Sequence, residues 1–145
     1  MYDVPKVNVE KIIKADRAKV FNTVTDFENL PSKLPSYFKA MKVVSREGDS
    51  IVIEESIRMA GRDITQTAKH ILWPPEKHEV FILDGEAKDS HIVETYESTA
   101  EGTKITIDGD FKLAGKLKLV GFLAAGKIKS SIEEVMNEFA RIVEH

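Results

Sequence analysis

Apolar and polar residues alternate along most of the middle of this chain, a period that is typical of β-strands with one covered face. The first alternating segment covers residues 4–13 and places Val7, Val9 and Ile13 on one side. Six further strand candidates follow, and each ends at a turn or a proline. They cover residues 39–46, 51–59, 63–72, 78–83, 92–98 and 104–113.

Helical spacing appears near both ends of the chain. Asp16 can begin a short helix, because its carboxylate can accept hydrogen bonds from the free amides of the first turn. A second short helix or turn follows and ends before Pro35. The packed side of the first helix is expected to carry Ala18, Phe21, Val24 and Thr25.

The C-terminal segment carries the strongest helical pattern, since its apolar residues recur at steps of four and three. This spacing predicts an amphipathic helix of about 20 residues or more with one apolar stripe. The stripe consists of Gly121, Ala125, Ile128, Ile132, Val135, Phe139 and Ile142.

The order of these elements is a strand, two short helices, six strands and a long helix. Strands that are grouped together and flanked by helices indicate an α+β fold with an antiparallel sheet. The length of 145 residues fits one domain, residues 1–145. The last helix is the only predicted element large enough to cover one face of such a sheet.

Three segments of the chain carry a resemblance to a known superfamily. They are residues 15–21 with 24–31, the hairpin Glu47-Gly48-Asp49, and the late strand from Gly102 that precedes the long helix. The chain resembles the START-like superfamily, also called SRPBCC, which includes birch-pollen-type allergens, polyketide cyclases and lipid-transfer domains. The nearest likeness is to its polyketide cyclase/dehydrase and lipid-transport groups, and it covers essentially the full length.

This resemblance implies a helix-grip fold, in which a seven-stranded curved antiparallel sheet surrounds the long C-terminal helix. Two short helices would follow the first strand, and a deep cavity would lie between sheet and helix. The shared motifs describe a fold, which can support many functions. They therefore carry no catalytic residue over to this chain.

Composition narrows the classes of function. The net charge of −3 gives no sign of the cationic face that nucleic acid requires, so we expect no nucleic-acid partner. The sequence has no cysteine, no HExxH motif and no phosphate-binding loop, so we expect neither a metal nor a cofactor. It begins without a signal-peptide pattern and holds no apolar run that could span a bilayer, which predicts a cytoplasmic protein.

A few polar residues interrupt the apolar faces of the predicted strands. If those faces line the cavity, the polar set Glu55, Gln66, His70, Glu94 and Tyr96 would point into it. A buried carboxylate must be paired, neutralised or functional, which makes Glu55, His70 and Glu94 the candidates for catalysis. The alternative is a register slip that turns Glu55 and Glu94 to the rim or to solvent, with His70 as a structural histidine.

The apolar wall of the cavity is predicted from the same faces and from the long helix. Its methionines could adapt to ligands of irregular shape, although plain core packing would produce the same pattern. The predicted wall consists of Phe38, Met41, Ile53, Ile57, Met59, Phe81, Ile107, Phe111, Phe122, Ile128, Ile132 and Met136.

The segment from Lys112 to Lys129 combines five lysines, three glycines and several large apolar residues, and it has no acidic residue. One interpretation is an entrance for lipid that makes transient contact with a membrane surface. The alternative is a solvated helix start whose lysines keep the protein in solution.

Three functions remain open from the sequence. The first is a carrier or receptor for an apolar small molecule or lipid. The second is an enzyme of the polyketide cyclase/dehydratase kind, in which a cavity carboxylate or histidine acts as acid or base. The third is a co-chaperone or assembly factor that offers a concave surface to a polypeptide.

Overall fold

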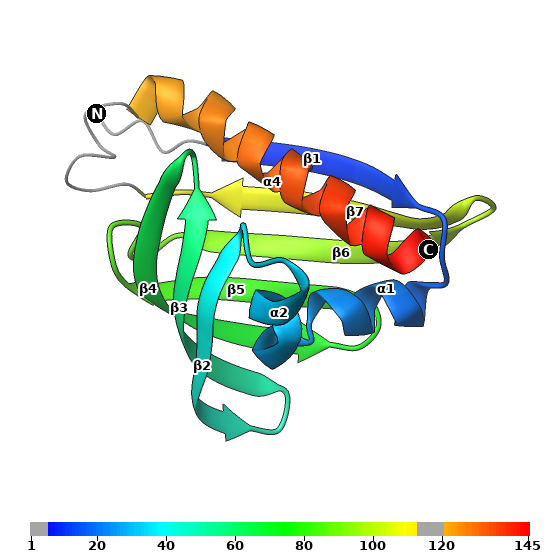
Figure 1. Cartoon of the computed structure of the whole chain (residues 1–145), viewed down its shortest axis with the longest axis horizontal. Coiled ribbons are helices and arrows are strands. Elements are labelled where there is room, and N and C mark those ends of the chain that lie inside the picture. The colour runs from blue at the N-terminus through cyan, green and yellow to red at the C-terminus, as the bar shows by residue number, and fades with distance from the viewer. Residues whose placement is uncertain (1–5, 113–120) are drawn as a thin grey trace.

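A computed structural model describes residues 6–112 and 121–145 of the chain, apart from the side chains of residues 121–124. Seven antiparallel strands form one sheet in the order β1-β7-β6-β5-β4-β3-β2. Figure 1 shows that this sheet curves around the long C-terminal helix α4. The strands are β1 (Lys6–Ile13), β2 (Phe38–Glu47), β3 (Ser50–Met59), β4 (Arg62–Trp73), β5 (Lys77–Asp84), β6 (His91–Thr99) and β7 (Gly102–Asp110).

The helices begin and end close to the predicted positions. Helix α1 (Arg17–Val24) is capped by Asp16, whose carboxylate accepts hydrogen bonds from the amides of Ala18 and Lys19. A 3-10 turn η1 (Phe27–Asn29) and the short helix α2 (Leu30–Lys33) follow, and both end before Pro35. Helix α4 (Gly121–Glu144) has 24 residues. The predicted α+β helix-grip architecture is therefore confirmed.

One residue on the packed side of α1 differs from the prediction. Ala18 is exposed, whereas Val20 is fully buried together with Phe21 and Val24. A similar change occurs at the end of α4, where Val143 is buried and Ile142 is only partly buried. The difference in α4 follows from helix geometry, because a helix of 3.6 residues per turn drifts away from a stripe that repeats every 3.5 residues.

Irregular pairing bends the sheet at its β2 edge and near its centre. The β2–β3 pairing shifts between Phe38 and Ala40 and again between Val43 and Ser45. The β4–β5 pairing shifts between Thr67 and Ala68. Such bulges bend a strand and increase its twist, and they produce a concave face on which α4 lies.

The main core fills the region where α1, α4, β1 and β7 meet. Val20, Phe21 and Phe139 from the helices pack against Ile13 and Ile105 from the strands, and all five are almost completely buried. Figure 1 shows α4 running alongside β1 and β7, with α1 near its C-terminal end. The core is closely packed near the C-terminal end of α4. Further along the concave face, the space between the sheet and α4 is not filled.

Candidate functional site

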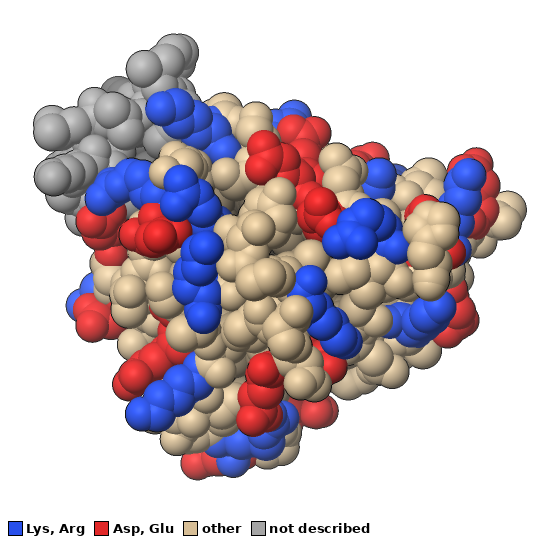
Figure 2. Space-filling model, in the orientation of Figure 1, with Lys and Arg blue, Asp and Glu red and all other residues tan. Residues whose placement is uncertain are grey.

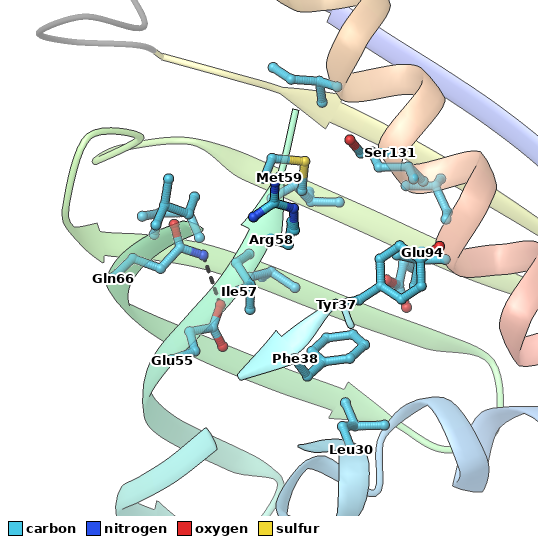
Figure 3. Close-up of a pocket in the computed structure, with 18 of the residues that line it drawn as sticks. Leu30, Tyr37, Phe38, Glu55, Ile57, Arg58, Met59, Gln66, Glu94 and Ser131 are labelled. Carbon is cyan, nitrogen blue, oxygen red and sulfur yellow. Dashed lines mark hydrogen bonds between the residues drawn. The ribbon is translucent and has the colours of Figure 1, made fainter. Parts of the chain in front are cut away.

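A cavity of about 190 Å³ lies between the concave face of the sheet and α4. Ile128, Ile132 and Met136 of α4 form part of its apolar wall, and Ile57 and Met59 of β3 form another part. Figure 3 shows Ile57 and Met59 beside the polar groups of the wall. A cavity of roughly 150 Å³ is enough to hold benzene, so this space fits a small ring or a short chain.

Five polar side chains from four neighbouring strands form a continuous series of hydrogen bonds on the sheet side of this cavity. Gln66 Nε2 donates to Glu55 Oε1 over 2.8 Å, and Glu55 Oε2 lies 3.0 Å from His70 Nε2. His70 Nδ1 lies 2.8 Å from His78 Nε2. His78 Nδ1 lies 2.8 Å from Glu94 Oε1. We call Glu55, Gln66, His70, His78 and Glu94 the polar chain.

Strand register explains why these side chains meet. Glu55 pairs with Gln66 across β3 and β4, and His78 pairs with Glu94 across β5 and β6. His70 is opposite Val80, two residues from His78, so the imidazoles are diagonal neighbours on one face of the sheet. Directly opposite and diagonal residues of adjacent strands are within reach of long side chains.

The two imidazoles are buried in the middle of the polar chain and are covered by the ring of Phe27. They stack with ring centroids 5.1 Å apart, and the Phe27 ring of η1 lies 4.4 Å from His70 and 5.4 Å from His78. Glu55, His70 and His78 are each at most 5% exposed. A ligand in the cavity can therefore reach the ends of the polar chain more easily than its middle.

Tyr96 extends the polar chain beyond the cavity. Its hydroxyl donates a hydrogen bond of 2.6 Å to Glu94 Oε1. Burial raises the pKa of Tyr96 well above its usual value, and the charge and hydrogen bonding of Glu94 raise it further, so Tyr96 stays a donor.

The pKa of Glu94 moves in the opposite direction. Burial alone would raise it, but the charge of His78 and the hydrogen bonds from His78 and Tyr96 outweigh that effect. The net pKa of Glu94 is lowered below the ordinary value of 4.5. Glu94 is therefore a carboxylate at neutral pH despite its position inside the protein.

The cavity opens toward a second, shallower hollow at the protein surface. The two share Tyr37, Arg58, Ala60 and Ser131, and we call these four residues the mouth. The Ser131 hydroxyl accepts a hydrogen bond from the amide of Ala60 and so joins α4 to the β3–β4 turn. In Figure 2 the surface between α4 and β2 is mainly uncharged, with cationic and anionic side chains interspersed around it.

Most of the predicted site residues lie at the cavity. Of the polar set, Glu55, Gln66, His70 and Glu94 line it, whereas Tyr96 is buried behind Glu94 with its ring 5.1 Å from that of Phe21. In Figure 3, Glu55 and Gln66 lie on one side of the cavity and Glu94 on the other. The apolar predicted residues that line it are Phe38, Met41, Ile57, Met59, Ile107, Phe111, Ile128, Ile132 and Met136.

Two apolar predictions are corrected by the structure, as is the placement of Tyr96 in the wall. Phe81 lies on the outer face of the sheet, where its ring stacks on His91 at 4.4 Å. Strand β5 is apolar on both faces, and Val80 and Ile82 occupy the cavity side in its place. Ile53 is completely buried in the main core and does not reach the cavity.

Phe122 lies outside the side chains that the structure describes. The same holds for residues 113–120 of the predicted membrane-contact segment Lys112–Lys129. Within the described ranges, no helix is long and apolar enough to cross a membrane. Membrane contact by this segment stays a prediction.

Among the lining residues that were not predicted from the sequence, two are in direct contact with the predicted polar set. His78 occupies the middle of the polar chain, and Phe27 covers both imidazoles. His78 alternates with Val80 and Ile82, and all three lie on the cavity face of β5, but alternation alone could not show which face of this strand is inside. Phe27 comes from a turn, where alternation carries no information.

The arrangement supplies acid–base groups and hydrogen-bond acceptors in an apolar space. Within residues 6–112 and 125–145, no group of three His, Asp or Glu side chains is placed to hold a metal ion. A cavity with mainly apolar walls and a few converging polar groups is the usual form of a small-molecule site. The fold and the cavity thus define a helix-grip protein with an internal pocket.

Comparison with known families and structures agrees with that class. The model of the family described as polyketide cyclase / dehydrase and lipid transport matches residues 4–144, and the chain belongs to this family. No curated protein matches it in sequence.

Solved structures share the fold over nearly the whole chain. A protein of Thermus thermophilus has a TM-score of 0.83 at 18% identity, covering 96% of this chain and 97% of that one. A START superfamily protein from Mycobacterium smegmatis has a TM-score of 0.81 at 16% identity, with 96% and 97% covered. The Zhui aromatase/cyclase from a Streptomyces species has a TM-score of 0.75 at 15% identity, with 98% and 94% covered. Identities this low establish the shared fold and no shared reaction.

Proposed function

We propose that this protein binds a small apolar molecule in the cavity between its sheet and α4, as a carrier or receptor. The observation that carries the proposal is the cavity of about 190 Å³ with an apolar wall and polar groups gathered along its sheet side. The residues in contact with the ligand would be those of the wall, among them Ile57, Met59, Ile132 and Met136.

Burial of apolar surface is the expected driving force. A ligand that buries about 200 Å² of apolar surface gains roughly 5 kcal/mol at about 25 cal/mol per Å². Association and ordering costs reduce this gain, so the polar groups are expected to decide which ligand binds tightly. The family description, which includes lipid transport, supports a role in binding.

A cavity-filling substitution tests this proposal. Ile57 lines the cavity and is partly exposed to it, so Ile57→Trp should fill the space without disturbing the main core. We expect octanol, added as a probe and followed by calorimetric titration, to bind the native protein and to bind Ile57→Trp at least about tenfold more weakly.

The matched control is Val44→Trp, which adds the same ring at an exposed position of β2. It should leave octanol binding unchanged. The proposal fails if the native protein binds neither octanol nor other apolar probes, or if both tryptophan variants bind octanol equally well. Native mass spectrometry of the purified protein would reveal any apolar molecule that it already carries.

A second candidate function is an enzyme of the cyclase or dehydratase kind. The observation that favours it is the hydrogen-bonded series Glu55–His70–His78–Glu94, which places acids and bases beside the space for a ligand. Removal of water from a β-hydroxyketone needs a base at the carbon next to the carbonyl and an acid at the leaving hydroxyl. Both roles are within the chemistry of imidazole and carboxyl groups.

This second function would be tested with a β-hydroxyketone that fits the cavity, with loss of water followed by mass spectrometry. Turnover that falls at least about a hundredfold in Glu55→Gln, His70→Ala and Glu94→Gln would support it. If all three variants keep the turnover of the native protein, this second function is excluded. A folded state confirmed by circular dichroism is the control for each variant.

A further inference from the structure

The contacts between the imidazoles and carboxylates of the polar chain determine how many hydrogens these groups share. Three contacts join Glu55, His70, His78 and Glu94, at 3.0, 2.8 and 2.8 Å. Each contact at such a distance needs one hydrogen, because two lone pairs or two N–H groups facing each other would repel. The three contacts also occupy all four imidazole nitrogens, so neither ring has a nitrogen left for a further hydrogen.

This number of hydrogens determines the net charge. Two neutral imidazoles hold two hydrogens, so the third hydrogen contributes one positive charge. The two carboxyl groups, Glu55 and Glu94, contribute two negative charges when ionised. The polar chain therefore keeps one net negative charge, wherever the three hydrogens lie along it.

That charge has no cationic partner among the described residues. Glu55 and Glu94 form ion pairs with His70 and His78 alone. Arg58, the cationic side chain at the mouth, is bound to Asp63 over 3.0 Å and to the carbonyl oxygen of Gly61 over 3.1 Å. The negative charge thus faces an apolar cavity.

One oxygen of the Glu94 carboxylate is free to accept a hydrogen bond from a ligand. Its Oε1 accepts hydrogen bonds from His78 and Tyr96, whereas its Oε2 accepts none from the described residues. Every fully enclosed side-chain nitrogen or oxygen in the described part of the chain has a partner, so Glu94 Oε2 is accessible. Glu94 lines the cavity, and its side chain is 13% exposed.

We propose that the ligand is a neutral apolar molecule with one hydroxyl group, an alcohol or a phenol, which donates its hydrogen bond to Glu94 Oε2. This inference rests on the proposed function and names the class of molecule bound. A carboxylate would bring a second negative charge next to the polar chain, and like charges in a medium of low dielectric repel strongly. An ammonium group would bring three hydrogens to a single free oxygen and leave two of them without partners.

The test compares three probes of equal chain length on the native protein by calorimetric titration near neutral pH. Octanol carries the donor, its methyl ether keeps the oxygen but lacks the donor, and octanoate carries a negative charge. A hydrogen bond to a charged acceptor is among the stronger ones. We therefore expect octanol to bind about tenfold or more tightly than either of the other two.

A variant then locates the effect. Glu94→Gln keeps the size of the side chain and removes its charge, so the preference for octanol over octanoate should fall about tenfold. Glu79→Gln is the matched control, because Glu79 also pairs with a histidine but lies on the outer face of β5. It should leave the affinities for all three probes unchanged.

Each outcome separates this inference from the proposed function. Equal affinity for octanol and its ether, or octanoate binding as tightly as octanol, would overturn the inference while the cavity remains a binding site. Failure of all three probes to bind would overturn the proposed function itself. If Glu94→Gln does not fold, the comparison of the three probes on the native protein still decides.

Discussion

Two histidine–glutamate pairs lie on opposite faces of strands β5 and β6. On the cavity face, His78 Nδ1 lies 2.8 Å from Glu94, and the two side chains are 4% and 13% exposed. On the outer face, His91 Nε2 lies 2.9 Å from Glu79, and the side chains are 39% and 16% exposed. The chemistry and distance are nearly the same, whereas the surroundings differ.

The surroundings determine what each pair contributes. The outer pair meets water, with Lys77 Nζ 3.4 Å from Glu79 and the Trp73 indole donating to the same carboxylate. Exposed pairs of this kind stabilise proteins little. The inner pair is linked to His70 and Glu55 inside an apolar space, where loss of one member leaves other buried groups without partners.

The largest expected effect is on stability. His70→Leu would leave Glu55 Oε2 and His78 Nε2 without a partner in the interior. We expect the free energy of unfolding in urea to fall by about 3–5 kcal/mol. His91→Leu, the same change on the outer face, should cost less than about 1 kcal/mol.

The comparison of these two leucine variants is its own control, since both lose an imidazole next to a carboxylate. Similar losses for both variants would show that burial of the inner pair has no energetic consequence.

The next effect is on the pH dependence of stability. The lowered pKa of Glu94 means that its stabilising contribution is present above the ordinary carboxyl pKa of 4.5 and is lost as the pH falls through the lower, folded value. We expect stability of the native protein to decrease in that acid range. The decrease should be smaller in Glu94→Gln, as measured by urea unfolding at a series of pH values.

Glu79 allows a matched measurement. Its pKa is also lowered, chiefly by the hydrogen bond with His91, so its contribution is lost over the same acid range. Because His91 beside Glu79 is 39% exposed, whereas His78 beside Glu94 is 4% exposed, Glu79→Gln should flatten the acid dependence less than Glu94→Gln. An unchanged acid dependence in Glu94→Gln would contradict the proposed electrostatic environment of Glu94.

The smallest effect concerns the outer pair alone. A double-mutant cycle of Glu79→Gln and His91→Gln should give a coupling energy below about 1 kcal/mol. Added salt should reduce it, since exposed charges are screened. A larger coupling that resists salt would show that the outer pair behaves like a buried one.

The sequence predicted the fold well because strand alternation and the helical stripe are local patterns. Alternation also placed Glu55, Gln66, His70 and Glu94 on the faces where the structure has them. The same patterns assigned Phe81 to the cavity wrongly, because β5 is apolar on both faces and its alternation does not say which face is inside.

The hydrogen bonds that join the polar residues could not be predicted from the sequence. The bond between His70 and His78 depends on the register of β4 with β5, and the bond between His78 and Glu94 depends on that of β5 with β6. A loop separates β5 from β6, and its length does not determine their register. Only the structure therefore shows that the separate candidate residues form one hydrogen-bonded series.

The most direct test of the account follows the histidine side chains by nitrogen-detected magnetic resonance while octanol is added. We predict that the imidazole signals of His70 and His78 shift and reach saturation together, because a donor at Glu94 Oε2 alters the whole polar chain. The signals of His91 should stay in place. Inner signals that do not move, or an equal response of His91, would contradict binding of the ligand at this site.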